Sequence, residues 1–131
     1  MQIKNDESMQ NDVLAFYKQV NLTRFHNQTK GHYESFFLRA NHPTRPLAFW
    51  IRYTLFSPKD HHENNIGELW GIFFNGESNH HIVAKQEYPL ANCLFDTTDF
   101  NIQIGSAKLS SRSFQGSIES KGEQVRVGYD I

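Results

Sequence analysis

Three charged residues stand inside runs of apolar and aromatic residues, and they are the first candidates for chemistry in this sequence. Glu34, Arg52 and Glu68 occupy the interiors of strand-like segments, with Trp50 and Trp70 two residues from Arg52 and Glu68. Charges among aromatic side chains are costly unless they are paired. We therefore expect a Glu34–Arg52–Glu68 network beside the two tryptophans.

Such a cluster suits one of two kinds of chemistry. A buried carboxylic acid with a raised pKa can protonate an alkene, which makes Glu34 and Glu68 the candidate catalytic residues. Aromatic rings with a few polar groups between them can instead bind an apolar ligand. The alternative is that the three charges are solvated edge residues or purely structural pairs. The candidate ligand-binding residues are Tyr33, Glu34, Trp50, Arg52, Glu68 and Trp70.

The network requires a particular strand register. A nearly symmetric turn over 41–46, which contains Pro43 and Pro46, would place Glu34 opposite Arg52. The next hairpin places Trp70 opposite Arg52 and Glu68 one diagonal away. The Asn75-Gly76 pair, two residues that tolerate positive φ, indicates a third hairpin.

Short strands separated by turn residues fill most of the chain. Such spacing is typical of an all-β antiparallel sandwich or barrel. The predicted strands are Tyr33–Ala40, Leu47–Phe56, Gly67–Phe74, His80–Gln86, Leu94–Phe95, Asn101–Ile104, Ala107–Leu109, Ser113–Ser120 and Gln124–Ile131.

One short helix is expected before the strands, over about 11–20. Val13, Phe16, Tyr17 and Val20 recur at helical spacing, with Ser8 or Asn11 as the cap. We divide the chain into a tail and helix over 1–30 and a β domain over 31–131. Because the last strand runs to residue 131 without a closing turn, we expect either a longer protein or pairing of this strand with another chain.

Two strands carry apolar residues on both faces. In the second, Phe49, Ile51, Tyr53 and Leu55 form one apolar face, while the other is mixed, and the third strand is apolar on both sides. A sheet with one solvated face would alternate cleanly between apolar and polar residues. We therefore expect both faces to be covered, one by a core and the other by a cavity.

Composition excludes several classes of protein. Thirteen basic and fourteen acidic residues provide no broad cationic surface for nucleic acid. No segment approaches the ~20 apolar residues of a transmembrane helix, and no secretory signal is evident, so we expect a cytoplasmic protein. Cys93 is interpreted as a small core residue. The His61-His62 and His80-His81 pairs lack the spacing of metal ligands, so no metal or cofactor is predicted.

Three segments carry a family resemblance. The runs Gly31–Asn41, Ala48–Thr54 and Gly67–Trp70 resemble the opening of the hydroxyneurosporene synthase (carotenoid hydratase) and AttH-like family, over roughly residues 31–120. The resemblance implies a lipocalin-like barrel or half-barrel, in a family whose fuller members carry two such domains. Some relatives add water to carotenoid double bonds, and similar folds host terpenoid or polyketide cyclisation. This chain resembles the first domain only.

Three functions remain open. The first is a lipocalin-like domain that binds a hydrophobic small molecule, isoprenoid or lipid-like, in an aromatic pocket. The second is a hydratase, isomerase or cyclase that acts on an isoprenoid-type alkene through a buried carboxylic acid. The third is a structural half-domain for self-association. A homodimer is favoured over a monomer, because it would supply the second half of the tandem arrangement.

Overall fold

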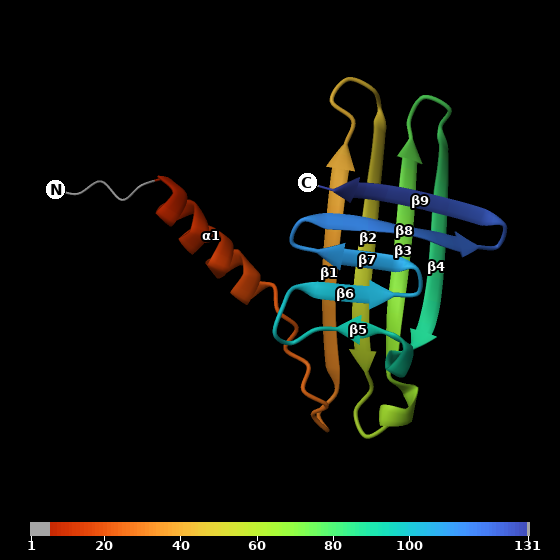
Figure 1. Ribbon diagram of the computed structural model, residues 1–131. Coiled ribbons are helices and arrows are strands. Elements are labelled where there is room, and N and C mark those ends of the chain that lie inside the picture. Colours follow the sequence, from red (N-terminus) through yellow and green to blue (C-terminus); the bar gives the residue numbers. More distant parts are fainter. Residues whose placement is uncertain (1–5, 131) are drawn as a thin grey trace.

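The protein is almost all-β, as the sequence predicts. The computed structural model describes the backbone of residues 6–130 and the side chains of that range, apart from positions 6, 120, 123 and 127–130. Its strands form two antiparallel sheets, which we call sheet A and sheet B (Figure 1). Sheet A contains β1 (His32–Asn41), β2 (Leu47–Ser57), β3 (Ile66–Asn75) and β4 (His80–Pro89).

Sheet B follows in sequence and contains the shorter strands. These are β5 (Leu94–Phe95), β6 (Asn101–Ile104), β7 (Ala107–Ser110), β8 (Ser113–Ser120) and β9 (Glu123–Asp130). Short 3₁₀ turns occupy His62–Asn64 and Leu90–Asn92. All nine predicted strands are confirmed to within three residues at each end, although residue 131 lies outside the described range.

The two sheets do not close into a barrel. They pack face to face with steeply crossing strands, the arrangement of an orthogonal sandwich (Figure 1). Within the described residues, every strand is paired only inside its own sheet. The closed-barrel form of the prediction is therefore wrong, and an open two-sheet sandwich replaces it. The last strand, β9, pairs with β8 along its whole length.

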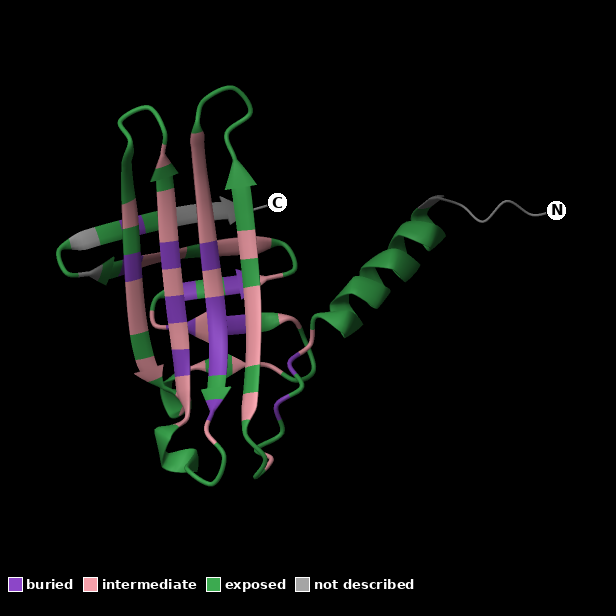
Figure 2. Ribbon diagram, turned by 180° about the vertical axis from the view of Figure 1, so that it is seen from behind, coloured by how far each residue is buried: buried purple, intermediate pink, exposed green. Residues whose placement is uncertain are grey.

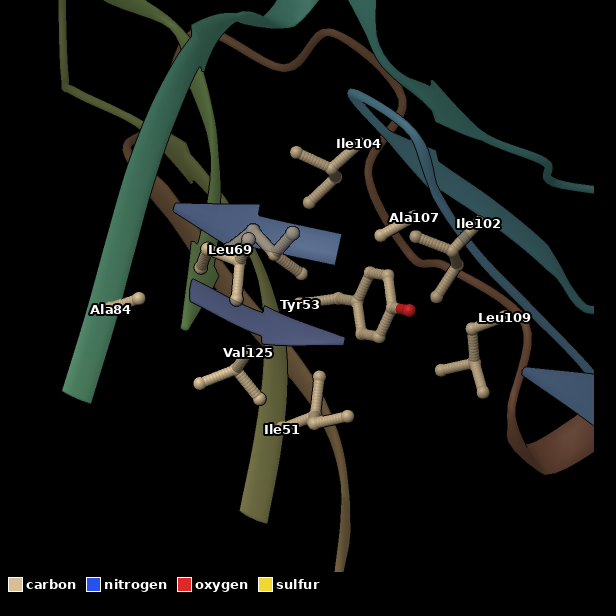
Figure 3. Packing of buried hydrophobic residues seen from close by; sticks show 10 residues of the cluster. Ile51, Tyr53, Leu69, Ala84, Ile102, Ile104, Ala107, Leu109 and Val125 are labelled. Atoms are coloured by element: carbon tan, nitrogen blue, oxygen red, sulfur yellow. The ribbon is translucent and has the colours of Figure 1, made fainter. Parts of the chain in front are cut away.

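The hydrophobic core fills the space between the sheets. Sheet A contributes Ile51, Tyr53 and Leu69, which meet Ile102 and Leu109 of sheet B (Figure 3). Tyr53, 2% exposed, lies at the centre, and its hydroxyl donates to the Lys108 carbonyl oxygen at 3.4 Å. Alternation along β2 directs Ile51, Tyr53 and Leu55 inward, so the predicted apolar face of this strand is confirmed.

The N-terminal helix is longer than predicted. α1 spans Asp6–Val20, so Ser8 and Asn11, expected as caps, lie inside it. It projects from the β1 side of the sandwich, away from both sheets (Figure 1). Among the described residues, no helix is long and apolar enough to cross a membrane.

The irregular segment 21–31 joins α1 to β1 and is anchored to it. Thr23 and Phe25 are buried, 6% and 8% exposed. The Thr23 hydroxyl donates to the Glu34 carboxylate at 2.7 Å, and the Arg24 amide donates to both oxygens of the same carboxylate at 3.1 Å. This segment, which the sequence assigned to the tail, is therefore packed as part of the β domain.

Candidate functional site

Four of the predicted site residues meet on the outward face of sheet A. Arg52 pairs with Trp70 across the β2–β3 ladder, as the register predicted. Its guanidinium carbon lies 5.3 Å from the centre of the Trp50 ring and 5.5 Å from that of Trp70. Lys85 of β4 lies on the other side of Trp70, with its amino nitrogen 5.0 Å from the ring centre. Cations and indole rings thus alternate across the face.

Glu68 joins these cations from the same face. Its carboxylate lies 3.7 Å from Arg52 Nη2 and 2.9 Å from Lys85 Nζ, and it accepts a hydrogen bond from Trp70 Nε1 at 2.5 Å. Burial acts to raise the pKa of Glu68, but the hydrogen bonds from Trp70 and Lys85 and the nearby positive charges outweigh it, so the pKa is lowered. Glu68 is therefore an anion at neutral pH and a poor proton donor.

Lys85 also explains why two carboxylates can face each other. Glu68 and Glu87 are directly paired across the β3–β4 ladder. Like charges in such positions destabilise a sheet. The amino nitrogen of Lys85 lies 2.9 Å from Glu68 and 2.8 Å from Glu87, so it bridges the two.

Glu34 is not part of this network, and its predicted pairing with Arg52 is wrong. The His42 amide donates to the Leu47 carbonyl at 2.8 Å, which extends the β1–β2 ladder into the predicted turn. The register shifts by three residues, so Glu34 pairs with Leu55 and Phe37 faces Arg52. An odd shift moves every side chain of a strand to the other face. Glu34 therefore points to the inner side, where Thr23, Arg24 and His32 surround its carboxylate.

Tyr33, the remaining predicted site residue, shares the outward face but lies near its end. It pairs with Phe56, and the two rings are 6.4 Å apart. The sequence analysis missed Lys85, although strand alternation places it on the same face as Val83. Its position opposite Trp70 follows only once the β3–β4 register is known.

The outward face of sheet A is not covered, contrary to our expectation for both faces. Within the described part of the chain nothing lies over it (Figure 2, where sheet A is in front). Five of its large apolar side chains remain 40–63% exposed. We call this surface the outer aromatic face, and its exposed members are Tyr33, Phe37, Phe56, Phe74 and Val83.

A groove opens at the free edge of β1. It has a volume of ≈ 350 Å³ and is lined mainly by Phe36, Phe37, Leu38, Phe100 and Leu109. The space between the sheets, by contrast, holds only ≈ 20 Å³, enough for about one water molecule. The space between the sheets is therefore filled by the core, and this edge groove is a separate hollow.

Two polar residues also line the groove. They are Asn21, at the end of α1, and Ser35, whose hydroxyl lies 2.9 Å from that of Thr54.

Among the described residues, no three His, Cys, Asp or Glu side chains lie close enough together to hold a metal ion. Cys93 is half-buried, and burial raises the pKa of its thiol.

Comparisons with known proteins do not assign the chain to a family. No protein-family model, curated protein or solved structure gives a significant match. The site must therefore be interpreted from its own geometry.

Proposed function

We propose that this protein is a lipocalin-like binding module that takes an apolar small molecule, isoprenoid or lipid-like, into the groove at the β1 edge. The observation that carries the proposal is the ≈ 350 Å³ hollow lined by aromatic and aliphatic side chains. Small-molecule sites commonly have about 300–1,000 Å³ and are mostly apolar, with a few polar groups. The groove is at the small end of that range.

The lining also indicates the shape of the ligand. Phe36 and Phe100, with ring centres 5.8 Å apart and ring planes inclined at 42°, give the groove an aromatic wall that suits an unsaturated chain. Asn21, which also lines the groove, can hydrogen-bond one polar end group. A chain alcohol or a fatty acid of modest length has this combination of an apolar body and a single polar end.

Acid catalysis has less support than binding. Glu68 is held by Arg52, Lys85 and Trp70, so its pKa is lowered, whereas a proton donor needs the opposite shift. Glu34 accepts hydrogen bonds from Thr23 and Arg24 and is not among the residues that line the groove. Neither carboxylate is among the residues that line the groove or the small hollow between the sheets.

The family resemblance supports the same proposal. The similarity of residues 31–120 to the first domain of the hydroxyneurosporene synthase and AttH-like family favours a lipocalin-like module and an isoprenoid ligand. The single cysteine, Cys93, favours the cytoplasm as its location.

Ligand titration of the purified protein tests this function. The fluorescent polyene cis-parinaric acid is the probe, and farnesol competes for the site. We expect saturable one-to-one binding. Asn21→Trp, which adds a bulky side chain to the lining of the groove, should weaken it at least about tenfold. Ser78→Trp adds the same bulk in the exposed β3–β4 turn and should leave affinity within about twofold. Absence of saturable binding, or equal binding by both variants, would overturn the proposal.

A further inference from the structure

An apolar stripe runs along α1 and faces solvent. Met9, Val13, Phe16, Tyr17 and Val20 follow helical spacing, which places them on one side of the helix. Their side chains are 43–61% exposed. We call these five residues the α1 stripe. In water, so much apolar surface on one helix face is unusual for a helix without a partner.

Among the residues that the structure describes, none covers the α1 stripe. A different side of the helix, formed by Asn11, Leu14, Ala15 and Lys18, faces Ser111 and Arg112 across an open space. Lys18 Nζ also lies 3.2 Å from the Asp99 carboxylate. With these residues turned toward the domain, helix geometry directs Met9, Phe16 and Val20 away from it.

The helix is also held away from its own sheet A. Its last turn is followed within three residues by Thr23, whose hydroxyl is bonded to Glu34 of β1, and then by the buried Phe25. This anchor fixes the carboxyl end of α1 at the β1 edge while the helix points outward (Figure 2). Within the described part of the chain, no surface is therefore placed to cover the α1 stripe.

The outer aromatic face is the matching surface. Five of its exposed side chains are apolar or aromatic, and its strands are about 33 Å long, against about 22 Å for the helix. A helix about 10 Å wide covers two to three strands of such a sheet. Arg39, exposed on the same face opposite Trp50, provides a cation at its margin.

We propose that α1 packs on the outer aromatic face of a second copy of this chain, and that the exchange is reciprocal. An aromatic side chain that is half exposed presents about 100 Å² of its surface to solvent. Two equivalent helix–sheet contacts would bury on the order of 2,000 Å², which is the size of a stable dimer interface. Both halves of the contact belong to the same chain, so a two-fold axis satisfies both copies at once.

A membrane surface fits these surfaces less well. Interfacial helices carry many lysines and arginines, whereas Lys18 is the one cation among the described residues of α1, beside Glu7 and Asp12. The outer aromatic face also presents Glu68 and Glu87, which anionic headgroups repel.

Analytical ultracentrifugation of the full chain from about 1 to 200 μM tests the proposal. We expect a concentration-dependent dimer. Phe16→Glu in the α1 stripe and Phe37→Glu on the outer aromatic face should each raise the dimer dissociation constant at least about tenfold. The matched control, Gln19→Glu, adds the same charge on the polar side of α1 and should leave it within about threefold. Circular dichroism of each variant checks that it is folded.

Mixing the two variants distinguishes the exchange from other dimers. Each variant alone lacks both contacts, but a mixed pair retains one, formed by the α1 stripe of the Phe37→Glu chain and the outer face of the Phe16→Glu chain. We expect the mixture to associate more tightly than either variant alone. A wild-type monomer at 200 μM would overturn the proposal, as would a dimer that tolerates either variant. Monomeric protein that binds phosphatidylserine vesicles through Phe16 would overturn it in favour of a membrane.

Discussion

At the scale of the residue, Arg52 shows how a charge is kept among aromatic side chains. Its guanidinium lies between the Trp50 and Trp70 rings, and Glu68 is 3.7 Å away. The side chain remains 27% exposed, so water still screens part of its charge. Arg52 therefore stabilises the sheet through two contributions, its stacking on the tryptophan rings and a partly screened ion pair with Glu68.

We expect Arg52→Ala to lower the free energy of unfolding by about 1–2 kcal/mol, because two cation–π contacts and one of the cationic partners of Glu68 are lost. Urea denaturation followed by tryptophan fluorescence measures this change. Arg39→Ala, an exposed arginine on the same face, is the control and should change stability by less than about 0.5 kcal/mol. Equal effects of the two variants would show that the stacking around Arg52 contributes nothing.

The candidate site could be predicted in part from these residues. Arg52, Glu68, Trp50 and Trp70 meet as expected, because strand alternation and the β2–β3 register were both readable from the sequence. Glu34 was misplaced because turn composition does not determine where a ladder ends. The bond from the His42 amide to Leu47 sets that point, and it reverses the facing of the whole strand.

At the scale of the element, the turns show what sequence can and cannot specify. Asn75-Gly76 correctly indicated the β3–β4 hairpin, but the residue with positive φ there is Asn79, at 53°. The Asn75 side-chain oxygen instead accepts hydrogen bonds from the Glu77 and Ser78 amides. The sequence therefore predicted the hairpin, whereas its loop geometry depends on a side-chain hydrogen bond that composition does not reveal.

Two glycines in the hairpins of sheet B allow a matched test of turn strain against packing. Gly105 and Gly122 both have positive φ, 58° and 80°. A Cβ at Gly105 would lie 2.7 Å from the Tyr88 hydroxyl, but one at Gly122 would meet nothing within 4 Å. The backbone cost should therefore be similar at the two positions, and the steric cost should arise only at Gly105.

We expect Gly122→Ala to lower the free energy of unfolding by about 1 kcal/mol, the cost of a left-handed alanine. Gly105→Ala should cost about 1–3 kcal/mol more, because Tyr88 must move out of a packed position. Thermal and urea unfolding of both variants give the comparison. If the two losses were equal, Tyr88 would not be packed against the β6–β7 turn.

At the scale of the whole molecule, the prediction of a closed barrel was wrong because the described strands form ladders only within their own sheets. β4 ends at Pro89 and the 3₁₀ turn Leu90–Asn92 separates it from β5, so the chain changes direction between sheets instead of continuing one ladder. Sequence periodicity reports which side chains are buried, and both a barrel and a sandwich bury alternate residues. The pattern therefore predicted the strands and the core of this fold, but not its closure.

Tyr53 lies where the two sheets meet, so it reports on the integrity of the whole sandwich. Burial raises the pKa of Tyr53 to about 12, from the usual 10.0. Above pH 10 the unfolded chain ionises at this position while the folded chain still holds the proton. The stability that this difference provides is fully present below pH 10 and is lost as the pH rises through 12.

We expect the free energy of unfolding of the wild type to fall by about 2–3 kcal/mol more between pH 9 and pH 12 than that of Tyr53→Phe, which cannot ionise. Urea unfolding across this range measures the difference. Ile51→Val, a core change on the same strand without a titratable group, is the control, and its effect should be the same at every pH. Parallel curves for wild type and Tyr53→Phe would mean that water reaches the Tyr53 hydroxyl and that the two sheets are less tightly packed than Figure 3 shows.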